Sequence, residues 1–149
     1  MVPRSIRLMC IAIASAASLP VAGAPPATAQ RNVNAVSPAL PNSAQRRAIL
    51  AALRPAVESR LGPNVEFMVG DIRVRRGWAI VHADPRRRGG GRIDGRRIFP
   101  NYDEMDGLTV TAILRYQNGR WGLVDHAIGA TDAWYCAPRI AAPRELTAC

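Results

Sequence analysis

The sequence predicts an α+β fold, with one N-terminal helix packed on a four-stranded antiparallel sheet that runs as a meander. Two observations indicate this class. Apolar residues recur every three or four positions over residues 42–61, which is the spacing of one face of a helix. Further along, four segments with alternating apolar residues form two neighbouring pairs, each joined by a tight turn. A helix laid across such a sheet buries the apolar faces of both.

The helix is expected to begin at Asn42 or Ser43, either of which can accept a hydrogen bond from the first turn. It should end at Gly62 and Pro63, because glycine is favoured just after a helix and proline cannot continue one. Pro55 lies inside this range without a backbone N–H, so we expect a kink or a restart there. The stripe expected to face the sheet consists of Ile49, Leu53, Val57 and Leu61, with Leu50 beside it.

The first pair of strands is expected over residues 65–74 and 78–84. The alternation of the first strand changes phase after Val69, and Gly70-Asp71 is where a β-bulge would restore it. The second strand is expected to end at Pro85, which cannot donate a hydrogen bond to a neighbouring strand.

The second pair, expected over residues 108–117 and 120–129, flanks Asn118-Gly119, which is typical of a two-residue hairpin turn. This turn places Tyr116 opposite Trp121, and an unbroken ladder then places Asp125 opposite Ala112 on an apolar face. His126 points to the other face, because successive side chains of a strand alternate. The register therefore argues against a catalytic pair formed by Asp125 and His126.

Asp125 is the acid that this register leaves on an apolar face. Such a carboxylate is costly unless it is paired or hydrogen-bonded. It can be structural, in an ion pair with an arginine or hydrogen-bonded to backbone N–H groups. Alternatively, it faces a ligand in a binding or enzymatic pocket between helix and sheet. No catalytic motif accompanies it, and no catalytic residue is assigned.

The N-terminus is expected to be a signal peptide covering residues 1–29. Arg4 and Arg7 precede an apolar stretch over residues 8–19, and a small-residue cleavage site ends at Ala29. A disordered linker is expected over residues 30–41, because prolines, alanines and polar residues follow one another there without periodicity. A single α+β domain then covers residues 42–149. The mature chain should be periplasmic or secreted, with no membrane span.

Cleavage after Ala29 would leave two cysteines, Cys136 and Cys149. An even number of cysteines in an exported protein predicts a disulfide, here worth roughly 3 kcal/mol. The adjoining Trp134 and Tyr135 are either a packed plug under that disulfide or an exposed contact patch. A metal site is not expected, because no C-x-x-C is present and His82 has no companion ligand. No cofactor is expected either.

Charge is the most unusual property of the composition. All 20 basic residues are arginine, against 11 acids, for a net charge of +9. Loss of Arg4 and Arg7 with the signal peptide would leave about +7. Compositional bias accounts for arginine in place of lysine, but the charge still favours anionic partners. Six arginines gather around the glycines of the loop that follows the second strand: Arg86, Arg87, Arg88, Arg92, Arg96 and Arg97.

This loop is either a solvated connection or a contact for an anionic surface, since arginines bind phosphates through paired hydrogen bonds. The glycines do not form a phosphate-binding P-loop, because the chain contains no lysine. Nucleic acid is not the expected partner of an exported protein. The candidate ligand-binding residues are therefore Asp125 and the six loop arginines.

Several segments together resemble a group of small exported proteobacterial proteins described only as hypothetical. They are ILAALRPAVESRLG, a strand ending in WAIVHADP, and DGLTVTAILR with GRWGLVDHAIGATDAWY after it. The resemblance covers most of residues 45–135 and implies a periplasmic helix-plus-meander domain of the cystatin-like kind. It implies no activity and no site residues. We therefore expect an exported binding domain that contacts an anionic envelope component or a protein, with a ligand pocket at Asp125 as the alternative.

Overall fold

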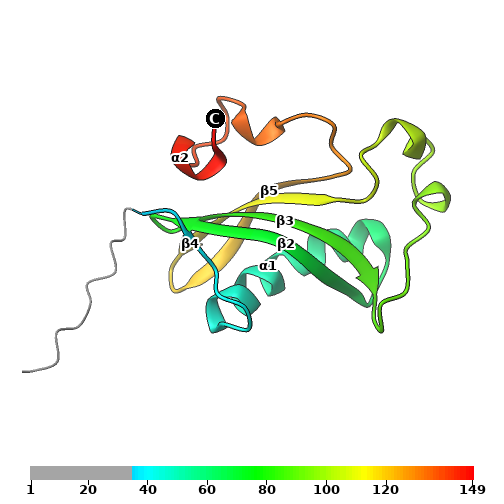
Figure 1. The fold of residues 1–149 in the computed structure, drawn as a ribbon, viewed down its shortest axis with the longest axis horizontal. Coiled ribbons are helices and arrows are strands. Elements are labelled where there is room, and N and C mark those ends of the chain that lie inside the picture. The colour runs from blue at the N-terminus through cyan, green and yellow to red at the C-terminus, as the bar shows by residue number, and fades with distance from the viewer. Residues whose placement is uncertain (1–34) are drawn as a thin grey trace, which may run out of the picture. The chain divides into compact units, whose positions relative to one another are not determined.

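The computed structural model describes residues 35–149 of the chain. The signal peptide expected over 1–29 and the first part of the expected linker lie outside these residues. Within them, the α+β prediction is confirmed. One long helix, α1 (Ala44–Leu61), lies against an antiparallel sheet whose strands follow one another in chain order (Figure 1).

The sheet has five strands rather than four, in the order β1-β2-β3-β4-β5. The long strands are β2 (Val65–Arg75), β3 (Trp78–Arg87), β4 (Val110–Gln117) and β5 (Arg120–Ile128). The extra strand, β1 (Ser37–Pro38), pairs with the end of β2, and Ala39 after it is buried. Residues 35–41 thus differ from the expected linker, because a sheet edge was available for them to pair with.

Helix α1 follows the apolar spacing of its sequence. Ser43 is the N-cap, and its hydroxyl accepts a hydrogen bond from the backbone N–H of Arg46 at 3.1 Å. The helix continues through Pro55 as one element, so the expected restart does not occur. Its fully buried side chains are those of the expected stripe, Ile49, Leu53, Val57 and Leu61.

The β2–β3 hairpin contains the expected bulge, because the pairing skips Gly70 between Val69 and Asp71. The predicted end of β3 at Pro85 was wrong, since the strand continues to Arg87 and Pro85 pairs with Phe67. The pairing between β3 and β4 stops at Ala83. Pro85 therefore has no strand on its second side, and its missing N–H leaves no carbonyl acceptor of a β4 residue without a donor.

A second bulge, in β5, was not expected. Leu123 pairs with Leu114 and Asp125 pairs with Ile113, so Val124 is left between two ladder pairs. Every later residue of β5 changes face. The predicted pairing of Asp125 with Ala112 was therefore wrong, because His126 occupies that position.

Both faces of the sheet are covered. α1 lies on one face, and the segment after β5 crosses the other (Figure 1). That segment includes the 3-10 helix η3 (Trp134–Cys136) and the short helix α2 (Arg144–Thr147). Leu146 is fully buried against Ile80 and Ile113, and Trp134 and Tyr135 pack against the same cluster, as expected of a plug. The predicted disulfide, Cys136–Cys149, closes this segment on itself.

No helix among residues 35–149 is long and apolar enough to cross a membrane.

Candidate anion-binding pocket

The six arginines of the loop do not act alike. Arg87, at the end of β3, reaches back to the C-terminus of α1 and donates to the carbonyl oxygens of Leu61 at 2.6 Å and Pro63 at 2.9 Å. The last carbonyls of a helix have no partner within the helix and carry partial negative charge. Arg87 therefore holds the helix against the sheet.

Three more of the arginines are paired with acids. Arg88 lies 3.8 Å from Glu66, Arg96 lies 2.6 Å from Asp103, and Arg97 lies 3.1 Å from Asp94. All three pairs are largely exposed, so each adds at most about 1 kcal/mol to stability. They do, however, neutralise three of the six loop arginines locally.

Arg86 and Arg92 are different. Neither forms an ion pair within the described part of the chain, and both line one polar pocket of ≈ 290 Å³. Two guanidinium groups that share a pocket without an internal carboxylate partner can each offer a pair of N–H donors to an oxyanion. The other lining residues are Asp84, Pro85, Ile93, Tyr102, Asp106, Gly107, Leu108 and Thr109.

The backbone brings these two arginines to one pocket. β3 carries Arg86 to the end of the sheet, and a tight turn then reverses the chain before Arg92. The Gly90 N–H donates to the carbonyl of Arg87 at 2.9 Å, and the Arg87 N–H donates to the carbonyl of Gly91 at 2.7 Å. Gly89 and Gly90 have φ of 82° and 87°, a region that other residues rarely adopt. The glycines thus shape the turn rather than hold a phosphate themselves.

The opposite wall of the pocket comes from Tyr102, at the start of the 3-10 helix η2 (Tyr102–Glu104), and from residues 106–109, which precede β4. The 3-10 helix η1 (Gly95–Arg97) lies behind this wall, against Tyr102. Gly95 is buried directly against the ring of Tyr102, where a Cβ atom would overlap the ring. The absence of a side chain at Gly95 therefore fixes the position of Tyr102 in the wall.

Two carboxylates, Asp84 and Asp106, lie in the same pocket as the two arginines. Asp84 accepts a hydrogen bond from the hydroxyl of Thr109 at 3.0 Å. Asp106 is anchored through its backbone N–H, which donates to the carbonyl of Gly129 at 3.0 Å. The pocket therefore combines donors for an oxyanion with acceptors for hydroxyl or amine groups.

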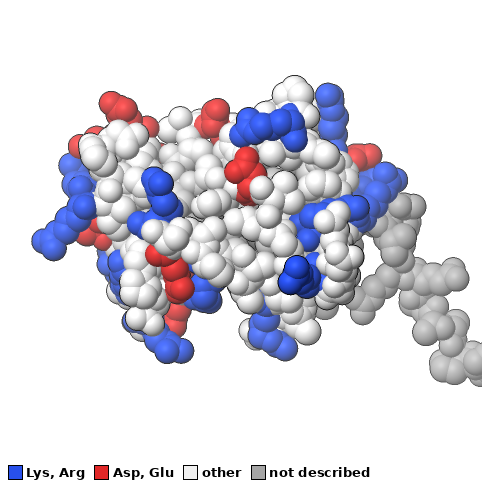
Figure 2. Space-filling model, turned by 180° about the vertical axis from the view of Figure 1, so that it is seen from behind, with Lys and Arg blue, Asp and Glu red and all other residues white. Residues whose placement is uncertain are grey.

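Charge is dispersed on the face seen in Figure 2. Basic side chains there are separated by acidic and uncharged ones, and they form no continuous basic surface. A binding function on this face cannot rest on a broad positive patch, so the local arrangement at Arg86 and Arg92 matters more.

Asp125 is not at the interface of helix and sheet, where the sequence placed it. The bulge at Val124 turns it to the face covered by the C-terminal segment. There it lies 3.4 Å from Arg139, and it accepts a hydrogen bond from the backbone N–H of His126 at 2.8 Å. An ion pair with an arginine and a hydrogen bond from a backbone N–H are the two structural roles that we expected as the alternative to ligand binding for this carboxylate.

The two histidines are half-buried and separate. Burial lowers the pKa of His82, and the positive charge of Arg73 lowers it further, with an opposing effect of Asp71. Burial also lowers the pKa of His126, against a raising effect of Asp125, while Arg60 lowers it further. No group of three or more potential metal ligands occurs among residues 35–149.

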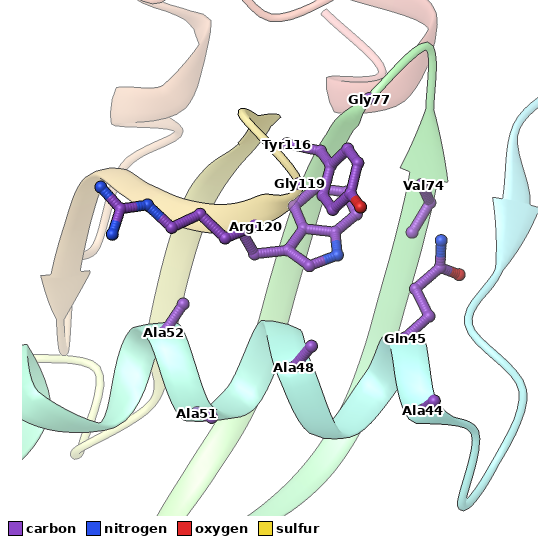
Figure 3. A pocket seen from close by; sticks show the side chains of 11 residues that line it. Ala44, Gln45, Ala48, Ala51, Ala52, Val74, Gly77, Tyr116, Gly119 and Arg120 are labelled. Carbon is purple, nitrogen blue, oxygen red and sulfur yellow. The ribbon is translucent and has the colours of Figure 1, made fainter.

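A second hollow lies between α1 and the ends of the two hairpins (Figure 3). It has a volume of ≈ 660 Å³, and alanines of the helix form its floor. Trp121 and Tyr116, with ring centroids 5.3 Å apart, also line it, and Gln45 and Arg120 contribute polar groups. Sequence reasoning missed this groove, although the spacing of Ala44, Ala48, Ala51 and Ala52 along one side of the helix was a visible signal.

Comparison of the chain with family models, with curated proteins and with solved structures finds no match. The protein is therefore classified by its fold alone. It is an α+β domain with one helix on an antiparallel meander, a disulfide-closed C-terminal segment and a polar pocket at one end of the sheet.

Proposed function

We propose that this protein is an exported binding domain that holds a phosphate group of an envelope component in the pocket of Arg86 and Arg92. The observation that carries the proposal is that, within residues 35–149, four of the six loop arginines are bound by groups of the chain and two are not. Arg87, Arg88, Arg96 and Arg97 are satisfied by carboxylates or carbonyls of the chain, whereas Arg86 and Arg92 face one pocket without an ion pair.

Phosphate is the group that this arrangement suits. Two guanidinium groups can each present paired N–H donors to the oxygens of a tetrahedral anion. Because both arginines line one cavity, an anion bound there can contact both guanidinium groups. The overall positive charge of the chain raises the local concentration of anionic ligands.

Export to the periplasm or beyond is part of the same proposal. A disulfide that closes the C-terminal segment is typical of oxidising compartments. Together with export, we propose that the protein belongs to the group of small exported proteobacterial proteins that its sequence resembles. Their cystatin-like arrangement is part of this proposal. A fusion that retains residues 1–29 should deliver a periplasmic reporter, and cytoplasmic retention of that fusion would contradict export.

Co-sedimentation with phosphatidylcholine vesicles, with and without phosphatidic acid, tests the binding function. Phosphatidic acid exposes a phosphate monoester, so it should retain the protein, and inorganic phosphate should release it. The Arg86→Gln/Arg92→Gln variant should lose most of this binding, about tenfold or more in affinity.

The matched control is Arg88→Gln/Arg97→Gln, which removes the same net charge from arginines that are paired with acids. It should bind the vesicles nearly as well as the unmodified protein. Equal losses in the two double variants would mean that net charge alone drives binding, and the proposal would then fail.

Binding of an apolar small molecule in the groove between α1 and the ends of the two hairpins is a second candidate function. Its volume of ≈ 660 Å³ favours it, since small-molecule sites usually enclose roughly 300–1,000 Å³ and are mostly apolar. Asp125, the acid first connected with such a pocket, plays no part because it lies on the other face of the sheet.

NMR titration with decanoate tests this second candidate. The indole N–H of Trp121 and the side-chain amide of Gln45 should shift saturably, because both residues line the groove. Ala48→Leu should fill the groove and abolish the shifts. Ala56→Leu is the matched control on the same helix and should leave them unchanged. Undiminished binding to Ala48→Leu would exclude the groove.

A further inference from the structure

The pocket of Arg86 and Arg92 also contains two carboxylates, and a bare phosphate does not account for them. Asp84 and Asp106 line the same space of ≈ 290 Å³. A carboxylate beside an anion site weakens the binding of the anion by charge repulsion. The acids are therefore useful only if the ligand carries hydrogen-bond donors next to its phosphate.

From this combination we infer that the ligand is a phosphorylated sugar, with its phosphate on Arg86 and Arg92 and its hydroxyl groups on Asp84 and Asp106. The inference rests on the proposed function, because it assigns the ligand class of the same pocket. Ionised carboxylates only accept hydrogen bonds, and sugar hydroxyls are suitable donors for them.

The environment of Asp84 supports a hydroxyl-bearing ligand. Its carboxylate already accepts a hydrogen bond from the hydroxyl of Thr109 at 3.0 Å, which leaves further acceptor sites for the ligand. Asp106 and Asp84 are both exposed side chains, and neither forms an ion pair within residues 35–149. Both acids are therefore available to a ligand in the pocket.

The size and the apolar part of the wall point to one sugar ring. The volume of ≈ 290 Å³ lies just below the usual range for small-molecule sites, about 300–1,000 Å³, so the ligand must be small. Pro85, Ile93 and Leu108 add apolar surface between the charged groups. A sugar ring presents C–H groups to such surface while its hydroxyls point to acceptors, whereas a small ammonium group would leave the apolar surface uncovered.

Dissociation constants for three probes test the inference: inorganic phosphate, glucose 1-phosphate and phosphoethanolamine. NMR titration of the unmodified protein should show glucose 1-phosphate binding about tenfold more tightly than inorganic phosphate, because its hydroxyls add hydrogen bonds to charged acceptors. Phosphoethanolamine should bind more weakly than glucose 1-phosphate.

Asp106→Asn gives the sharpest discrimination, because the two ligands should respond in opposite directions. Removal of the negative charge should strengthen the binding of inorganic phosphate a few-fold and weaken the binding of glucose 1-phosphate by about tenfold. Asp132→Asn, an exposed acid outside the pocket, is the matched control and should change neither constant.

The outcomes separate this inference from the proposed function. If inorganic phosphate does not bind at Arg86 and Arg92, both are overturned. If it binds there but glucose 1-phosphate shows no preference, only the sugar assignment is overturned. Stronger binding of both ligands to Asp106→Asn, or preference for phosphoethanolamine, would also overturn the sugar assignment.

Discussion

Asp125 lies opposite Ile113 in the pairing of β4 with β5, and the bulged residue Val124 precedes it. This relationship places Asp125 under the C-terminal segment, beside Arg139, and places His126 on the face that α1 covers. One extra residue in a strand thus exchanged the environments of the two side chains that first suggested chemistry.

Asp125→Asn should lower the free energy of unfolding by no more than about 1 kcal/mol, because the ion pair with Arg139 is exposed and weak. Urea denaturation measures the change, with Asp132→Asn as a control that should have no effect. Binding of phosphate should be unaffected. A loss of about 3 kcal/mol or more would show that the carboxylate is buried and that this placement is wrong.

Stability should fall as the pH drops below the ordinary histidine value of 6.5, because the pKa values of His82 and His126 are lowered in the folded state. The unfolded chain then binds more protons between the lowered values and 6.5, which favours unfolding. Urea midpoints measured from about pH 7.5 down to about pH 5 should decrease, and less so in His126→Gln. A midpoint that rises over this range would contradict the buried neutral histidines.

Loss of the disulfide should release the C-terminal segment. The Cys136→Ser/Cys149→Ser variant should lose roughly 3 kcal/mol of stability. The fluorescence of Trp134 should shift to longer wavelength, because the indole packs against Ile80, Ile113 and Leu146 in the closed segment. Unchanged stability and fluorescence would show that packing alone holds the segment.

Gly95→Ala should disturb the candidate pocket without touching a charged group. The added methyl group would overlap the ring of Tyr102, at a cost of about 1–3 kcal/mol, and would displace that ring from the pocket wall. Affinity for phosphate should fall together with the melting temperature. Gly91→Ala, where a Cβ atom would meet only ordinary contacts with Arg87, is the control. Unchanged phosphate binding in Gly95→Ala would remove Tyr102 from the site.

The class of fold was predictable because periodicity is local. The helix stripe from Ile49 to Leu61 and the turn at Asn118-Gly119 are found where the sequence predicts them. The bulge at Gly70 was also predictable, because a change of phase coincides with a glycine. The bulge at Val124 was not, since Val124, Ala127 and Ile128 give both faces of β5 apolar residues and the phase is ambiguous.

The candidate pocket was predictable only in part. The arginine cluster is evident in the sequence, but which arginines are paired depends on residues far along the chain. Arg87 is bound by carbonyls of Leu61 and Pro63, and Arg88 lies by Glu66 on the neighbouring strand. Asp106, which lines the pocket, is anchored by the carbonyl of Gly129, which follows β5. Such pairings follow from tertiary packing, which no local pattern encodes.

Phosphate binding at Arg86 and Arg92 is measured most directly by an NMR titration of the protein with inorganic phosphate, observed at the side-chain Nε–H groups of the arginines. We expect saturable shifts at Arg86 and Arg92, little change at Arg88 and Arg97, and loss of the shifts in Arg86→Gln/Arg92→Gln. Shifts of similar size at all exposed arginines, without saturation, would contradict a site at this pocket.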